Sequence, residues 1–203
     1  MAIPFHEDFP HDYRVRLLAA RPAILPVRYF VYPKLVDEIE KEALLLEISP
    51  NAGASWTGAF ALGFAEPSVV TGAFSCPNPC WICVIAGGYA YLVNASAPAE
   101  FVHLRPRPVT QALPVAAVKD AGILLLCDFT TITAIGVDGV AWETPALSWE
   151  GLSLEKIEGG VLYGKGWDAI ADREVPFTVD LMTGGCEGGA APPRQSAGCE
   201  GRL

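Results

Sequence analysis

Hydrophobic positions near the start of the chain recur at every second residue. Residues 13–17 read Tyr-Arg-Val-Arg-Leu, and residues 27–31 keep apolar side chains at the same two-residue spacing. Successive side chains of a β-strand point to opposite faces, so this alternation predicts short strands with one buried face. Pro22 and Pro26 interrupt the pattern and separate the strands.

The next segment changes to a helical period. Residues 33–46 begin with proline, which suits a first helical turn, and place Val36, Ile39, Ala43 and Leu46 on one face. This spacing predicts one short helix near residues 33–46. The apolar end of the segment, "ALLLEIS", fits a strand equally well.

From Pro50 onward, glycine and proline divide the chain into short apolar pieces. These pieces are "GAFALGF", "WICVIAGGYAYLV", "ILLLCDFTTITAIG", "VAWET", "LSLEKIEG", "VLYG" and "FTVDLM". Short β-rich runs separated by turn residues indicate an all-β fold built mainly of antiparallel meanders.

An internal similarity links several of these pieces. "GGYAYLVNA" (87–95) aligns with "TTITAIGVD" (130–138) at an offset of 43, and "AIGVDG" aligns with "VDLMTG" (179–184) at 45. A period of this length is typical of four-stranded propeller blades. Residues 80–186 resemble blades of quinoprotein-like β-propellers, in which an apolar strand precedes an Asp-containing turn and a Trp-bearing strand.

The resemblance implies stacked four-stranded meanders. Three blades do not close a ring, so a partial propeller, a β-sandwich and an assembly completed by another chain all fit. We expect one mainly-β domain over residues 1–185, irregular over 1–75 and propeller-like over 76–185. Residues 186–203, rich in glycine and alanine, are expected to form a flexible tail.

The charge and the lengths of the apolar runs limit the kinds of partner that the chain can bind. The net charge is −9, and residues 1–35 carry five basic and three acidic side chains, so the remainder sums to about −11. Such a surface repels phosphate backbones, and we expect no nucleic-acid partner. No apolar run reaches the length of a membrane span, and the acidic start lacks the pattern of a signal peptide, so we expect no membrane contact and a cytoplasmic protein.

Cysteines provide one candidate site. In the cytoplasm the six cysteines are expected to be free thiols, ligands or a nucleophile rather than disulfides. "CPNPCWIC" spaces Cys76, Cys80 and Cys83 as ligands of zinc or an iron–sulfur cluster, or as a redox site. The possible fourth ligands are Cys127, Cys186 and His103. We favour the alternative, in which these cysteines are small buried side chains, because a β-meander follows them. No cofactor is expected unless the three sulfurs converge on zinc.

Three Trp-acid dipeptides provide a second candidate: Trp142-Glu143, Trp149-Glu150 and Trp167-Asp168. Indole faces stack on sugar rings, and a pair of carboxylates is the minimum machinery for glycoside hydrolysis. Adjacent residues of a strand face opposite sides, so each pair equally fits a core tryptophan beside a solvated acid. On that interpretation these tryptophans, with Trp81, anchor the β core.

No sequence motif points to a catalytic nucleophile with a neighbouring base, so the sequence favours a binding protein over an enzyme. We expect a binding, scaffolding or accessory-subunit protein that acts through protein–protein contacts, either with a partner or as a homo-oligomer. The alternatives are a carbohydrate-binding protein or hydrolase that uses the Trp-acid positions, and a zinc or redox protein that uses the cysteines.

Overall fold

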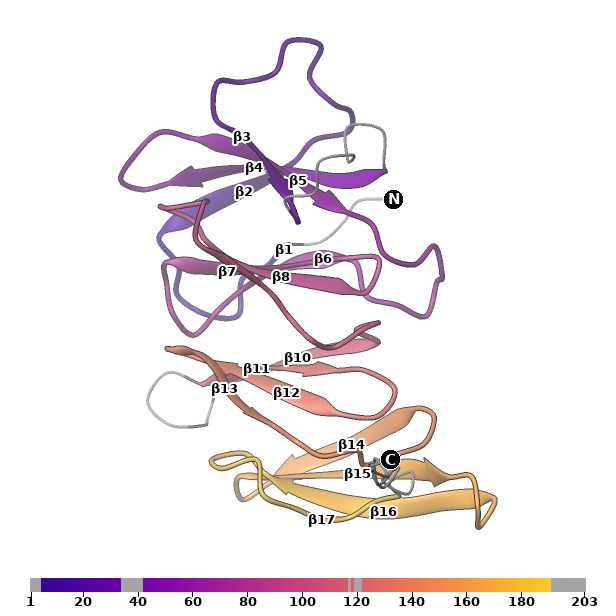
Figure 1. The fold of residues 1–203 in the computed structure, drawn as a ribbon. Helices are drawn as coiled ribbons and strands as arrows, with labels where there is room; N and C mark the ends of the chain where they lie inside the picture. Colours follow the sequence, from indigo (N-terminus) through magenta and orange to yellow (C-terminus); the bar gives the residue numbers. More distant parts are fainter. Residues whose placement is uncertain (1–4, 34–41, 117, 119–121, 191–203) are drawn as a thin grey trace, which may run out of the picture. The chain divides into compact units, whose positions relative to one another are not determined.

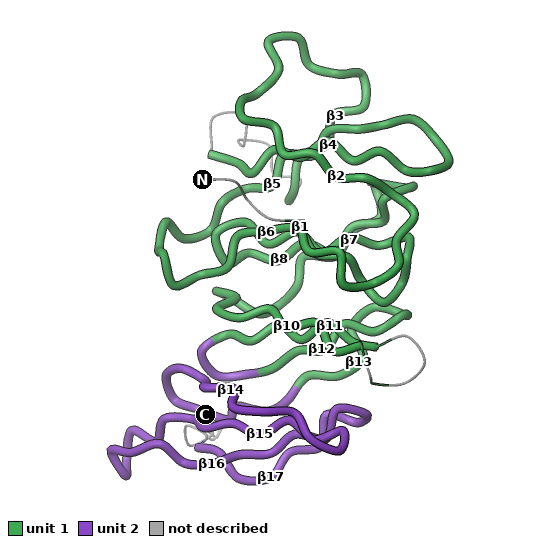
Figure 2. The backbone as a smooth tube through the Cα atoms, turned by 180° about the vertical axis from the view of Figure 1, so that it is seen from behind, with its two compact units in different colours: residues 1–128, 132–143 green, residues 129–131, 144–203 purple. Residues whose placement is uncertain are grey.

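The computed structural model describes residues 5–33, 42–116, 118 and 122–190. The chain forms two compact units (Figure 2). Unit 1 contains residues 1–128 and 132–143, and unit 2 contains residues 129–131 and 144–203. The described part holds 17 strands in four mostly antiparallel sheets and no helix, which confirms the all-β prediction.

The N-terminal sheet of unit 1 has the strand order β2-β4-β5-β3 (Figure 1). Its strands are β2 (Tyr13–Leu17), β4 (Ala43–Pro50), β5 (Trp56–Ala61) and β3 (Tyr29–Tyr32). β3 pairs in parallel with β5, and the other pairs are antiparallel. Buried and half-buried residues alternate along β4, as a strand with one enclosed face requires.

The central sheet of unit 1 has the order β1-β6-β7-β8-β9. Its strands are β1 (Phe5–His6), β6 (Gly72–Ser75), β7 (Trp81–Ala86), β8 (Tyr89–Asn94) and β9 (Phe101–His103). Gly87 and Gly88 both have positive φ, 55° and 77°, as a two-residue turn between β7 and β8 demands. β1 adds to β6 in parallel, so the start of the chain belongs to this sheet.

The third sheet of unit 1 is a meander of β10 (Gln111–Val115), β11 (Ile123–Cys127), β12 (Ile132–Gly136) and β13 (Gly139–Glu143). Both backbone views place the central sheet between the N-terminal sheet and the third sheet (Figures 1 and 2). Unit 1 is therefore a stack of three sheets with two core layers.

The first core layer joins the N-terminal and central sheets. It includes Trp56 and Phe60 from β5, Ile82 and Val84 from β7, and Tyr91 from β8. Two buried polar atoms in it reach backbone carbonyls: Trp56 Nε1 donates to Ala95 O at 2.7 Å, and Tyr32 Oη donates to Pro98 O at 2.6 Å. These hydrogen bonds remove the cost of burying the polar atoms.

The second core layer joins the central and third sheets. Its members include Cys83, Ile85, Leu92, Leu124, Leu126 and Ile135. Alternate residues of β7 thus enter opposite layers, so both faces of this strand are buried. This explains why "WICVIA" shows no polar alternation.

The segment that leads from β1 to β2 ties the central sheet to the N-terminal sheet. The buried Phe9 side chain enters the second core layer, and its backbone N–H donates to Ser75 Oγ at 2.9 Å. Tyr13, at the start of β2, donates from Oη to Trp81 O at 2.8 Å. The first residues of the chain therefore connect elements more than sixty positions apart.

Unit 2 is a single meander of β14 (Leu152–Glu158), β15 (Val161–Asp168), β16 (Arg173–Asp180) and β17 (Cys186–Gly188). Ser148 Oγ is fully bonded: it accepts from Trp167 N at 2.8 Å and donates to Gly151 O at 2.6 Å. Asp180 Oδ1 accepts from Met182 N and Thr183 N, and the hydrogen bonds from Thr183, first from its hydroxyl, lower the pKa of this carboxyl.

The predicted helix and the predicted C-terminal tail each lie partly outside the described residues. Residues 34–41 of the predicted helix lie outside the described part, but residues 43–46 belong to β4, so the helical prediction is wrong there and the strand alternative holds. Of the predicted tail, Cys186–Gly188 form β17 and residues 191–203 are not described. No helix among the described residues is long and apolar enough to cross a membrane.

One buried hydroxyl supplies a stability test. Thr133 Oγ1 is buried and has no hydrogen-bond partner among the described residues. An unsatisfied buried hydroxyl costs about 1–3 kcal/mol, so Thr133→Val should raise the free energy of unfolding by about 1 kcal/mol in urea titrations. Ser75→Ala is the matched control: it removes the acceptor of Phe9 N–H and should lower that free energy by about 1–3 kcal/mol. A less stable Thr133→Val protein would contradict the assignment.

Candidate functional site

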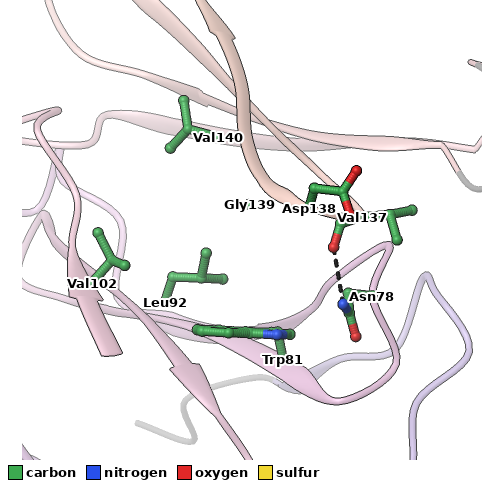
Figure 3. Close-up of a pocket in the computed structure, with 8 residues that line it drawn as sticks. All are labelled: Asn78, Trp81, Leu92, Val102, Val137, Asp138, Gly139 and Val140. Atoms are coloured by element: carbon green, nitrogen blue, oxygen red, sulfur yellow. Dashed lines mark hydrogen bonds between the residues drawn. The ribbon is translucent and has the colours of Figure 1, made fainter. Parts of the chain in front are cut away.

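A pocket of about 310 Å³ opens in unit 1 between the central and third sheets (Figure 3). We call it the Trp81 pocket. Its lining residues are Asn78, Trp81, Leu92, Val102, Val137, Asp138, Gly139 and Val140. They come from the start of β7, from β8 and β9, and from the turn and first residues of the β12–β13 hairpin.

Strand register explains why these side chains share one space. Leu92 on β8 is paired with Val102 on β9, so both side chains lie on the same face of the central sheet. Leu92 belongs to the second core layer, and Trp81 packs against that layer. On the third sheet, Val140 is paired with Ile135, another member of the layer. The pocket is the place where the second core layer reaches solvent.

Asn78 links the two sides of the pocket. Its Nδ2 donates to Val137 O at 2.9 Å (Figure 3), and its Oδ1 accepts from Cys80 N at 3.0 Å. The first bond ties the loop before β7 to the β12–β13 turn. The second holds the side chain in the orientation that makes the first bond possible.

The pocket combines an apolar wall with polar groups that have no partner in the described part of the chain. Val102, Val137 and Val140 are each about half exposed. The indole Nε1 of Trp81 and the carboxylate of Asp138 make no hydrogen bond or ion pair with any described residue. The site can therefore enclose an apolar group and still offer one hydrogen-bond donor and one negative charge.

The structure does not gather the three Trp-acid dipeptides into one unit. Trp142 and Glu143 lie on β13 in unit 1, where Glu143 Oε2 is 3.4 Å from Arg105 Nη1. The other two dipeptides belong to unit 2. There the backbone N–H of Trp149 donates to Trp167 O at 3.0 Å, so these two dipeptides are neighbours.

The Asp168 carboxylate stabilises the turn that follows β15. Its Oδ1 accepts from Ile170 N at 2.9 Å and from Ala171 N at 3.1 Å, which caps the turn after β15. Glu150 is exposed. Whether these acids and indoles bind sugar stays a prediction.

The core encloses the side chain of Trp56. This tryptophan is not among the four that we expected to anchor the core. It is 1% exposed and lies in the first core layer. The four expected anchors are each half-buried, and one of them, Trp81, packs against the second core layer. Trp56 begins β5, and residues 56–64 carry no charged side chain, which was the available signal in the sequence.

The cysteines of the "CPNPCWIC" motif differ in environment. Cys76 and Cys83 are fully buried in the second core layer, whereas Cys80 is half-buried. Burial raises the pKa of the Cys83 thiol to about 12 and that of Cys76 well above its ordinary value. Burial, with a smaller effect of the nearby thiols, also raises the pKa of Tyr13. The Cys76 and Cys83 thiols are therefore protonated at neutral pH.

Among the described residues, no group of three or more His, Cys, Asp or Glu side chains is arranged to hold a metal ion. Among the possible fourth ligands, Cys127 is buried, which raises its pKa to about 12, and Cys186 lies on β17 of unit 2. The zinc or redox site stays a prediction without support from this geometry.

His103 lies on the face of β9 opposite Val102. Its ring stacks on Tyr91 with centroids 4.7 Å apart, and its Nδ1 is 3.0 Å from Arg107 Nη2. A guanidinium only donates, so Nδ1 accepts and Nε2 carries the proton. Burial, and then the charge of Arg107, lower the pKa of His103. The neutral ring helps to hold the edge strand that carries Val102.

Comparisons with protein-family models, with curated proteins and with solved structures found no match to this chain. Any inference about function therefore rests on the site itself.

Thiol labelling tests the cysteine environments. At pH 8 a disulfide reagent should modify Cys80 and Cys186 in the native protein, because both are half-buried. Cys76, Cys83 and Cys127 should react only in denaturant, since the thiolate is the reactive form and burial suppresses it. Peptide mapping by mass spectrometry reads out each site, with the denatured protein as control. Native labelling of Cys83 as fast as Cys80 would contradict these burial assignments.

A pH titration tests His103. The pKa of His103 is about 6.5 in the unfolded chain and lower in the folded protein. Below pH 6.5 the unfolded chain therefore binds more protons than the folded protein. The free energy of unfolding should therefore fall as the pH drops through 6.5, and this fall should end below the folded pKa. His103→Gln should reduce the fall in urea titrations between pH 7 and pH 5, and Arg107→Gln should reduce it in part. A His103→Gln protein with the full pH dependence would refute the assignment.

Proposed function

We propose that this chain is a binding module that recognises an extended segment of a partner protein. One apolar side chain of the segment enters the Trp81 pocket, and a basic group beside it meets Asp138. The observation that carries the proposal is an open apolar pocket whose indole N–H and carboxylate have no partner among the described residues.

The dimensions of the pocket suit one anchoring side chain. A volume of about 310 Å³ is at the lower end of small-molecule sites and is sufficient for a large aliphatic or aromatic side chain. Full burial of such a side chain contributes roughly 1.5–3 kcal/mol. Single anchors in desolvated pockets dominate many protein interfaces.

The strands around the pocket also suit an extended ligand. β9 and β13 each end the strand order of their sheet, so each has one backbone edge without a neighbouring described strand. Val102 and Val140 lie on these edge strands. Edge strands beside an anchoring pocket support recognition by strand addition.

Charge favours a basic partner. The chain carries a net charge of −9, and one of its acidic residues, Asp138, lies at the pocket without an ion-pair partner among the described residues. Complementary charge speeds association and selects among partners more than it adds affinity.

A sugar suits this pocket poorly. Leu92 and the three valines are half of its lining residues, and they would leave sugar hydroxyls without hydrogen bonds. The aliphatic wall therefore favours a protein segment over a carbohydrate.

Two finer features belong to the same proposal. The meanders β10–β13 and β14–β17 share one strand order, and β8 aligns with β12 at the offset of 43 seen in the sequence, which supports repeated blade-like units. The five described cysteines are all free, which supports a cytoplasmic location.

A peptide library displayed on phage tests the proposal. Selection on the purified protein should enrich peptides that share one large apolar residue next to Lys or Arg. Val140→Asp should weaken their binding at least about tenfold, because it places a charge on the apolar wall. Asp138→Asn should weaken it by a few-fold through the lost charge.

Ile157→Asp is the matched control, because it changes an exposed apolar residue of unit 2 and should leave binding unchanged. The proposal fails if no sequence is enriched, or if enriched peptides bind the Val140→Asp protein as tightly as the natural one. A glycan array signal that Trp81→Ala abolishes would favour the carbohydrate alternative instead.

A further inference from the structure

The loop between β2 and β3 exposes apolar side chains far from the Trp81 pocket in sequence. It reads "LAARPAILPVR" (18–28), and it projects beyond the N-terminal sheet at the top of Figure 1. Ile24 is 89% exposed, Val27 is fully exposed, and Leu25 is about half exposed. Clustered exposed aliphatic residues mark an interaction surface, whereas single ones do not.

The backbone holds this loop at both ends. Leu18 N donates to Leu45 O at 2.9 Å, and Thr57 N donates to Arg28 O at 2.9 Å. Arg28 Nη1 also donates to Ala54 O. Pro22 and Pro26 restrict the backbone on either side of Ile24 and Leu25. The apolar tip is therefore presented outward before any partner binds.

The same segment is the most basic part of the chain. Residues 13–33 contain four arginines and no acidic residue, in a chain whose net charge is −9. Arg21 and Arg28 flank the apolar tip, and the guanidinium of Arg21 lies over the ring of Tyr29 at 5.5 Å. Arg16 on β2 is ion-paired with Glu47 Oε2 at 2.7 Å. Arg21 and Arg28 therefore supply the positive charge that lies beside the exposed apolar side chains.

We propose that this loop docks the protein onto an anionic lipid bilayer. Ile24, Leu25 and Val27 enter the boundary between headgroups and acyl chains. Arg21 and Arg28 meet lipid phosphates while their apolar stems follow the surface. The expectation of no membrane contact rests on the lack of a spanning segment, and a loop that lies at the interface needs none.

The shape of the loop favours a bilayer over a protein. Ile24 and Val27 are almost fully exposed on a loop that projects beyond the N-terminal sheet, so a protein partner would have to enclose them in a matching cavity. A bilayer accepts any apolar wedge and supplies anionic groups on every side of it. Three aliphatic side chains anchor less than one acyl chain, so the docking is expected to be weak, reversible and sensitive to salt.

Vesicle co-sedimentation of the full chain tests this inference. The protein should bind vesicles of phosphatidylcholine mixed with phosphatidylserine, and should bind vesicles of phosphatidylcholine alone much less. Ile24→Asp with Val27→Asp should reduce the bound fraction at least about tenfold. Arg21→Gln should weaken binding about fivefold, as expected for one basic residue at an anionic surface.

Two control variants test whether vesicle binding is specific to this loop. Ile170→Asp changes a side chain that is 79% exposed in unit 2 and should leave vesicle binding unchanged. Val140→Asp, which tests the Trp81 pocket, should also leave it unchanged, so the two proposals can fail separately.

The inference is overturned if the natural protein binds neither vesicle, binds both equally, or binds as well after the double substitution. It is also overturned if light scattering shows an oligomer that the double substitution dissociates while vesicles bind nothing. The loop would then be a contact between copies of the chain.

Discussion

Burial of both faces of the central sheet is the constraint on which unit 1 depends. β7 sends Ile82 and Val84 into one core layer and Cys83 and Ile85 into the other, so no position between them can carry a solvated side chain. An antiparallel sheet commonly has one face packed against the core and one face exposed to solvent. Here a sheet must cover each side, and the N-terminal sheet β2-β4-β5-β3 supplies one of those covers, while β1 adds a parallel edge strand to the central sheet itself.

The same constraint explains the pocket. Residues that continue a core layer toward an edge strand stay apolar, yet beyond the last strand nothing covers them. Leu92 is still enclosed, but its neighbour Val102 on β9 is half exposed, and so is Val140 on β13. The pocket is therefore a direct result of stacking two sheets whose edge strands lie next to each other. The Trp81 indole N–H and the Asp138 carboxylate, which have no partner in the described part of the chain, add a donor and a negative charge to it.

The strands were predictable because the alternation of apolar and polar residues that marks a strand is contained within a short segment of the sequence. Alternation predicted β2, whereas the sequence presented residues 81–93 as one β-rich run, which the structure divides at Gly87 and Gly88 into β7 and β8. The competing helical period at residues 43–46 misled because an apolar run satisfies either pattern, and only pairing with β2 and β5 decides it. The pocket was not predictable, since its valines are ordinary residues that strand register brings together from distant positions. The Trp-acid pairs attracted attention through composition, but the topology distributes them over two units.

Charge distribution gives the two proposed surfaces of unit 1 different roles. The residues after position 35 carry a net charge of about −11, so an anionic bilayer repels most of the chain and admits only the arginine-bearing end. A protein held by the loop at residues 18–28 would therefore present that end to the lipid. The Trp81 pocket belongs to the acidic remainder, with Asp138 unpaired beside it among the described residues. The repulsion that orients the chain on a membrane would keep that pocket open to a basic partner.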